Sequence, residues 1–231
     1  MRWSVMTITL LAALIGAAVW IGHSLTDDVP KAPSLQTQWV FVAAVLTVLC
    51  MSAGYAVNNR IDGILIDERN RVSLSRLQWV LWFVILVSAY FVGTVLNVQV
   101  GETNPFPEMQ TELFGLIGLA SGSAVVSNLI VDSKKRAKDA DVKGATKDAG
   151  WSDLYCGEEK GNKDVVDVSR LQQLVTTLLL VMVYVGFLWR DLDTAAFTGE
   201  LLKMPPVSTT FLGLLGASHA GYLAYKATPK T

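Results

Sequence analysis

Six apolar runs, each of about 20 residues, constrain the fold of this chain more than any other feature. They lie at 4–22, 38–57, 77–97, 112–131, 171–189 and 208–226. A helix of about 20 apolar residues crosses the roughly 30 Å hydrocarbon core of a bilayer, where every backbone polar group needs a partner within the protein. Since 52% of the 231 residues are hydrophobic, an ordinary soluble domain is excluded. We therefore predict an all-α membrane protein with six transmembrane helices.

A short motif that occurs twice indicates an internal duplication. It reads Ser75-Arg76-Leu77-Gln78 and again Ser169-Arg170-Leu171-Gln172, in each case at the start of a long apolar run. The runs that follow match as well, with the series Pro107, Thr111, Gly115, Gly118, Gly122 corresponding to Pro205, Thr209, Gly213, Gly216, Ala220. Repeated similarity of this kind marks repeated structural units. We predict that the helical hairpins 77–131 and 171–226 form a parallel repeat, related by an axis along the membrane normal.

The repeat divides one membrane domain into three parts. Residues 1–57 form an N-terminal hairpin, 58–132 form a loop plus the first repeated hairpin, and 133–231 form a longer loop plus the second. The run at 4–22 resembles a signal peptide. It is long for the apolar region of one and lacks a clear cleavage site, so we expect a membrane helix there.

The distribution of Lys and Arg predicts the orientation. If the N-terminus is cytoplasmic, 16 of the 19 Lys and Arg residues fall on the cytoplasmic side, and only Lys31, Arg190 and Lys203 fall outside. Positive residues favour the cytoplasmic side of short loops. We therefore expect an inner (plasma) membrane protein with both termini in the cytoplasm.

The repeated motif has two interpretations. A Ser followed three residues later by Gln is typical of a capping box at a helix start. Arg76 and Arg170 oppose the helix dipole but suit the membrane interface, so they are candidates for docking a lipid head group or a partner protein. Trp151, with Leu154 and Tyr155, forms a short amphipathic turn in the 133–168 loop and is a third docking candidate.

Small residues recur on one face of each of two runs. They are Gly115, Gly118 and Gly122 in the first, and Gly213, Gly216 and Ala220 in the second. Because small residues let membrane helices approach closely, we expect these two helices to be central and to pack through these faces. The alternatives are a pore lining or a contact between subunits, and large side chains such as Trp79, Trp82, Phe83 and Phe187 are expected on outer faces.

His219 is the one ionisable residue well inside a predicted span, and Ser121 occupies the matching position in the first repeat. An ionisable group within the membrane is a candidate for function. A neutral His that is hydrogen-bonded to a neighbouring helix satisfies the same physics, so a structural polar site and an ion pathway both remain open.

Other features exclude several classes of function. A net charge of −1 gives no case for nucleic acid binding, and no P-loop, hydrolase, zinc-protease or dinucleotide motif is present. The acidic pairs Asp67-Glu68 and Glu158-Glu159 are interleaved with Lys and Arg, which favours solvated charge over a metal site. We therefore expect no catalytic residues, no metal and no cofactor.

Three phrases carry a resemblance: Gly63 to Asn70, Ser73 to Gln78, and Leu215 to Ala227. They resemble sequences of uncharacterised bacterial multi-pass inner-membrane proteins. That resemblance implies a membrane location and carries no activity. We expect a non-enzymatic inner-membrane scaffold or complex subunit that contacts lipid and forms homo-oligomers or larger complexes. The alternative is a small ion channel or transporter with His219 near the pathway.

Overall fold

A computed structural model describes residue 16 and residues 34–137, 142–198 and 200–228, and in these the chain is all-α. The described residues form five long helices: α2 (Leu35–Asn58), α3 (Leu74–Gln99), α4 (Thr111–Arg136), α5 (Val168–Thr198) and α6 (Thr209–Ala227). Three short 3-10 turns, η1 (Gly63–Leu65), η2 (Thr146–Asp148) and η3 (Trp151–Leu154), lie in the loops. The predicted span 4–22 falls, apart from Gly16, outside the described residues.

Four of these helices, α2, α3, α4 and α5, are long and apolar enough to cross a membrane. The protein is therefore a multi-pass membrane protein. The fifth, α6, does not belong to this group, because it contains Ser218, His219 and Lys226 and many small residues. A sixth span and the repeat stay predictions.

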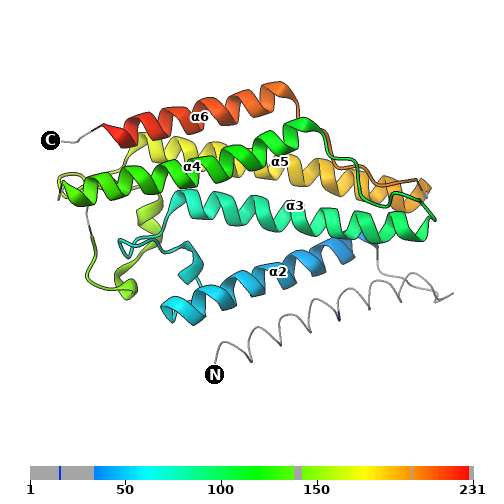
Figure 1. The fold of residues 1–231 in the computed structure, drawn as a ribbon, viewed down its shortest axis with the longest axis horizontal. Helices are drawn as coiled ribbons and strands as arrows, with labels where there is room; N and C mark the ends of the chain where they lie inside the picture. The colour runs from blue at the N-terminus through cyan, green and yellow to red at the C-terminus, as the bar shows by residue number, and fades with distance from the viewer. Residues whose placement is uncertain (1–15, 17–33, 138–141, 199, 229–231) are drawn as a thin grey trace.

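The helices form a four-helix bundle with a fifth helix on one side (Figure 1). In the bundle, α3 contacts α4 and α5, while α6 contacts α4 and α5; α2 lies against α3 and α5, on the side away from α6. The central helices are thus α3 and α5. The expectation that the glycine-bearing helices α4 and α6 would be central is wrong, although those two helices do contact each other.

The start of each repeated hairpin differs from the capping-box prediction. Helix α3 begins at Leu74 and α5 at Val168, so the motif serines lie within the first turn and cap neither helix. Asp167 accepts a hydrogen bond from the backbone N–H of Arg170 instead (3.2 Å). The Ser75 hydroxyl is buried and has no hydrogen-bond partner among the described residues.

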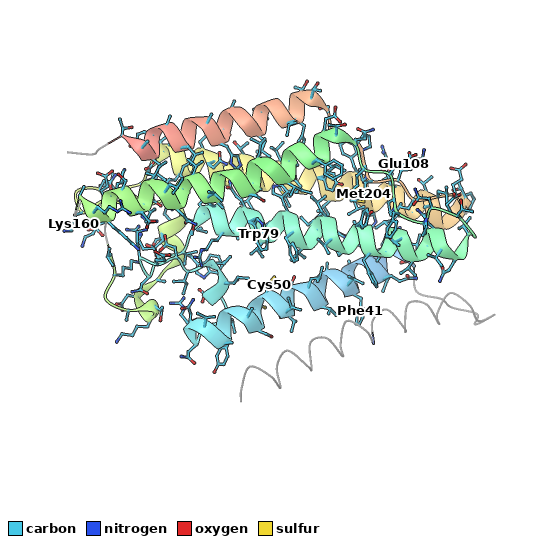
Figure 2. The ribbon with its side chains drawn as sticks, in the orientation of Figure 1. Phe41, Cys50, Trp79, Glu108, Lys160 and Met204 are labelled. Atoms are coloured by element: carbon cyan, nitrogen blue, oxygen red, sulfur yellow. The ribbon has the colours of Figure 1, made fainter. Side chains whose placement is uncertain are left out.

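Two loops fold together at one end of the bundle, and we call residues 59–73 and 142–167 the loop platform. A small apolar core, separate from that of the bundle, joins them; it contains Leu65, Ile66, Val72, Leu74, Ala149, Leu154 and Tyr222. Lys160 marks this loop end of the molecule, whereas Glu108 and Met204 mark the opposite end (Figure 2). Because α6 supplies Tyr222, the platform is packed directly onto the bundle.

Most of the large aromatic residues lie where the sequence predicts, with one exception. Trp79 and Phe187 are exposed on the sides of α3 and α5. Trp82, however, is buried between α3 and its neighbours, with its ring edge-to-face against Tyr184 at a centroid distance of 5.8 Å. The outer-face expectation is wrong for Trp82 because its ring packs against aromatic rings of two other helices, Tyr184 of α5 and Phe211 of α6.

Candidate functional site

A buried carboxylate, Glu158, joins the loop platform to the helix ends. It forms ion pairs with Arg69 of the first loop (2.9 Å), with Arg170 in the first turn of α5, and with Lys226 in the last turn of α6 (2.9 Å). All four side chains are almost completely buried. Segments far apart in the sequence therefore meet at one negative charge.

The charge balance around Glu158 keeps it ionised. Burial alone would raise the pKa of the Glu158 carboxyl, but the positive charges of Arg170, Lys226 and Arg69 outweigh that effect and hold the pKa well below its usual range. Burial would lower the pKa of the Arg69 guanidinium, yet Glu158 and Asp67 raise it. Both shifts favour the charged forms of Glu158 and Arg69.

The same lysine extends the cluster into the bundle. Lys226 donates to the Ser127 hydroxyl of α4 (2.6 Å) and to the Tyr222 hydroxyl (3.0 Å) as well as to Glu158. Three donors of one ammonium group thus have partners, which is what burial of a lysine requires. The next carboxylate, Glu159, pairs with Lys134 at the end of α4.

A second group of charges holds the platform together. Asp153 is buried and accepts from Lys143 (2.8 Å) and from the backbone N–H of Gly150 (2.9 Å), and it pairs with Arg71 (3.1 Å). Burial would raise the pKa of Asp153, but these hydrogen bonds and charges lower it overall. The Nε and Nη2 groups of Arg69 both donate to the same carboxylate oxygen of Asp67.

These contacts correct the prediction of solvated acidic pairs. Of the four carboxylates, only Glu68 is exposed, and it pairs with Lys135 at the surface. The other three have side chains that are less than a tenth exposed. The interpretation is wrong for Glu158 and Glu159 because their cationic partners come from distant segments, as for Lys226, which lies 68 residues from Glu158. Asp67 pairs with its neighbour Arg69, which is itself buried against Glu158.

Next to the cluster, on its side towards the middle of the bundle, several buried side chains are polar. The Gln78 side chain donates to the Thr177 hydroxyl (2.7 Å), which in turn donates to the backbone carbonyl of Gln173 (2.8 Å). The hydroxyl of Ser218 bonds to the side-chain oxygen of Gln173. Helices α3, α5 and α6 are therefore joined by side-chain hydrogen bonds on the loop side of the bundle.

His219 and Ser121 occupy different environments. His219 is buried, and its Nδ1 has no hydrogen-bond partner among the described residues. Ser121 is half-buried and lines an apolar recess between α3 and α4, together with Trp79 and Phe83. Within the described chain no hydrogen bond joins these two residues, so they do not form a single polar site.

The docking candidates are also placed differently from one another. Arg76 donates to the backbone carbonyls of Ile64 (3.4 Å) and Ile66 (2.6 Å), just after the first turn of its own loop. Arg170 donates to the carbonyls of Asp153 and Leu154 in the other loop, in addition to pairing with Glu158. Both arginines are thus engaged with the platform. Trp151 is exposed on the platform surface.

The predicted packing glycines separate into two groups. A Cβ on Gly115 would lie 2.9 Å from the Leu212 side chain, and one on Gly216 would lie 3.7 Å from the Leu119 side chain, so both sit in the contact between α4 and α6. Around Gly118, Gly122 and Gly213 nothing lies within 4 Å of such a Cβ. Together with Ala220, these three residues face outward. The expectation of packing within the chain therefore needs correction for these four residues.

The cluster has no arrangement typical of catalysis. Each of its carboxylates has cationic partners, and within the described ranges no group of three or more His, Cys, Asp or Glu side chains is placed to hold a metal ion. Sequence reasoning missed Glu158, Arg69 and Lys226 as a unit. The available signal was Lys226, a lysine at the end of an apolar run, since a charge that is drawn into the membrane region needs a partner.

Comparisons of the chain with protein-family models, with curated proteins and with solved structures returned no match.

Proposed function

We propose that this protein is a non-enzymatic membrane scaffold or a subunit of a membrane complex. The observation that carries the proposal is the attachment of the loop platform to the bundle through Glu158 and its three cations. A loop held by buried ion pairs and its own small core presents a fixed surface at the membrane. Fixed surfaces lower the entropic cost of binding a partner.

The interior of the far half of the bundle supports a scaffold more than a channel. Its buried side chains are mostly apolar: Ile85, Leu86, Ala89, Val92, Leu113, Leu116, Leu180, Leu188, Leu192 and Leu215. Of the buried polar side chains that the structure describes there, Ser88 bonds to carbonyls of its own helix, Asn97 to the backbone of Leu202 and Gln36 to Asp193, while Gln38 and Tyr184 are buried as well. A transporter usually has several polar groups near the membrane midplane.

The two loops support the proposed duplication of a hairpin. In each, a 3-10 turn is followed by an isolated antiparallel bridge, Ile66 to Val72 in the first and Cys156 to Val166 in the second. In each, the motif arginine then binds backbone carbonyls of its loop. We propose six spans in tandem hairpins, in the inner membrane of a bacterium, with the loop platform and both termini in the cytoplasm.

The outward-facing small residues support assembly. In lipid, helices associate through close contact of small residues, and Gly118 and Gly122 form a Gly-x-x-x-Gly pair on the exposed side of α4. We propose homo-oligomers or a larger complex that uses this side of the protein.

One observation favours the second candidate, a small ion channel or transporter. His219 is buried with an unpartnered Nδ1 in the same half of the bundle as the Gln78, Thr177 and Gln173 hydrogen bonds. Polar groups of this kind inside a membrane protein often mark an ion path.

Flux measurements separate the two candidates. Purified protein in liposomes should carry no K⁺, Na⁺, H⁺ or Cl⁻ flux above that of protein-free liposomes. Ion-selective flux that His219→Ala abolishes would overturn the scaffold proposal. The positive test is a photo-crosslinking residue in place of Ile61, which is exposed on the platform. In cells, the photo-crosslinking residue at position 61 should give one adduct of constant mass. The same photo-crosslinking residue in place of Val175, which we expect to face lipid, should give no such adduct.

Cysteine labelling tests the orientation. In a variant that lacks Cys50 and Cys156, single cysteines replace Lys147 of the platform or Thr103 at the opposite end. A membrane-impermeant reagent applied to intact cells should label Thr103→Cys and not Lys147→Cys. The reverse pattern would show that the platform faces outward.

A further inference from the structure

The exposed side of α5 gives a measure of where the bilayer lies. A stripe along one side of this helix is exposed and apolar; it consists of Val168, Leu171, Val175, Leu178, Leu179, Met182, Val183 and Phe187, and Trp189 ends the apolar part of the helix. From Val168 to Trp189 the helix rises about 32 Å at 1.5 Å per residue. The hydrocarbon core is about 30 Å thick, so these two residues fall near its two boundaries.

The chain immediately before this stripe is also apolar and exposed, although it belongs to the loop platform. Val165 and Val166 are 61% and 50% exposed, and Val168 is 73% exposed. On the other arm of the bridge lie Tyr155 and Trp151, which are 37% and 56% exposed. Apolar side chains therefore continue from the membrane-facing stripe of α5 onto the platform.

This segment, residues 151–168, is held in place. Its two arms are joined by the bridge between Cys156 and Val166, by the hydrogen bond from the Asp167 N–H to the Tyr155 carbonyl (2.8 Å), and by that from the Gly157 N–H to the Val165 carbonyl (3.1 Å). Arg170 fixes η3 through the carbonyls of Asp153 and Leu154. The apolar side chains thus keep a constant position relative to the start of α5.

The turn between the arms exposes two lysines and one carboxylate, Asp164. Lys160 and Lys163 lie there, both exposed, and Lys160 lies at the loop end of the molecule (Figure 2). An aromatic pair beside lysines is the composition found at membrane interfaces, where basic residues attract anionic lipids.

We propose that the 151–168 segment is an interfacial anchor, whose Trp151, Tyr155, Val165 and Val166 side chains insert into the head-group layer of the leaflet at the loop end, with Lys160 and Lys163 against anionic lipid phosphates. The occupant follows from continuity, because the segment extends the exposed stripe of α5, a helix long and apolar enough to cross a membrane. Burying apolar area in that layer stabilises the attachment of the platform to the membrane surface. The inference rests on the membrane placement of α5 and is independent of the proposed scaffold role.

Spin-label accessibility tests the anchor in the full chain. Cys50→Ala and Cys156→Ser remove the native thiols, and single cysteines at Val166, Lys147 or Val175 carry a nitroxide in nanodiscs of phosphatidylcholine with phosphatidylglycerol. Lys147 is the aqueous control on the same platform, and Val175 is the control within the bilayer. Each variant must keep the unfolding transition of the unlabelled parent to be compared.

At Val166 we expect the accessibility to oxygen to be higher than at Lys147. We expect the accessibility to a water-soluble nickel complex to be several-fold lower than at Lys147. Nickel access equal to that at Lys147 would place the segment in water and overturn the proposal. Low access to both reagents would show that protein covers it, which overturns the lipid assignment as well.

The lysine part of the proposal has its own measurement. Replacing phosphatidylglycerol by phosphatidylcholine should raise nickel access at Val166, and Lys160→Gln with Lys163→Gln should remove that dependence on lipid charge. If the parent shows no dependence, the two lysines do not contact anionic lipid.

Discussion

Replacing Glu158 with glutamine removes the one carboxylate on which three cations converge. After the change Arg69 keeps Asp67, and Lys226 keeps the Ser127 and Tyr222 hydroxyls. Arg170 keeps only backbone carbonyls among the described contacts. Two buried cations, Arg170 and Lys226, thus lose their negative partner.

Breaking a buried ion pair by removing one partner costs about 3–5 kcal/mol, because an uncompensated charge stays behind. We expect Glu158→Gln to lower the free energy of unfolding by about that amount. Reversible unfolding of the purified protein in mixed micelles with increasing denaturing detergent measures it. Both residues have similar volume, so a packing defect contributes little.

The matched control is Glu68→Gln, the same substitution at the exposed pair with Lys135. A surface pair of this kind contributes about 0–1 kcal/mol. Adding Lys226→Met to Glu158→Gln removes one of the unbalanced cations, so the double variant should lose less than the sum of the two single losses. A loss for Glu158→Gln no larger than that for Glu68→Gln would refute the reasoning about the cluster.

Further predictions concern the pH, two glycines of α4 and Ser75. Because the pKa of Glu158 lies well below its ordinary value of 4.5, the stability from its ion pairs is complete above that pH and is lost progressively as the pH falls from there towards the lowered pKa; detergent unfolding from neutral pH into the acidic range below the ordinary pKa should show this loss, reduced in Glu158→Gln. Gly115→Leu should cost about 1–3 kcal/mol by overpacking against Leu212, whereas Gly118→Leu should leave the monomer unfolding unchanged and should weaken any oligomer in crosslinking. Ser75→Ala should be neutral or slightly stabilising, because it removes a buried hydroxyl without a partner; a loss near the 1 kcal/mol typical of a cap would restore the capping interpretation.

The positions of the helices could be predicted from the sequence because bilayer thickness sets the length of an apolar run directly. All five runs that fall in the described residues are helices; four of these helices begin at most a few residues before the run, and α6 begins one residue after the start of its run. The length of the run alone could not decide whether α6 crosses the membrane. Its small residues and His219 lower its hydropathy, while burial of His219 depends on neighbouring helices.

The charge cluster could not be predicted, because its residues are neighbours only in space. Glu158 lies 89 residues from Arg69 and 68 from Lys226. In the sequence, Glu158 stands among Lys, Gly and Asn residues, a composition typical of a solvated loop. The local sequence correctly indicates a polar loop. Which of its charges are buried depends on the packing of Leu154 and Tyr222 into a shared core.

If the two hairpins are the copies that we propose, they need a feature that distinguishes them, and the cluster supplies one. Buried ion pairs contribute little net stability compared with well-packed apolar residues, but they can select one arrangement over others. Arg76 and Arg170 occupy the same position of the motif, yet Arg76 binds only carbonyls of its own loop among the described contacts, while Arg170 also reaches Glu158. Exchanging the two hairpins would leave Glu158 without this partner and Lys226 without its carboxylate. Burying these charges costs free energy, but it allows each loop to pack against only one of the two hairpins. A platform with a fixed position at the membrane surface requires such a unique arrangement.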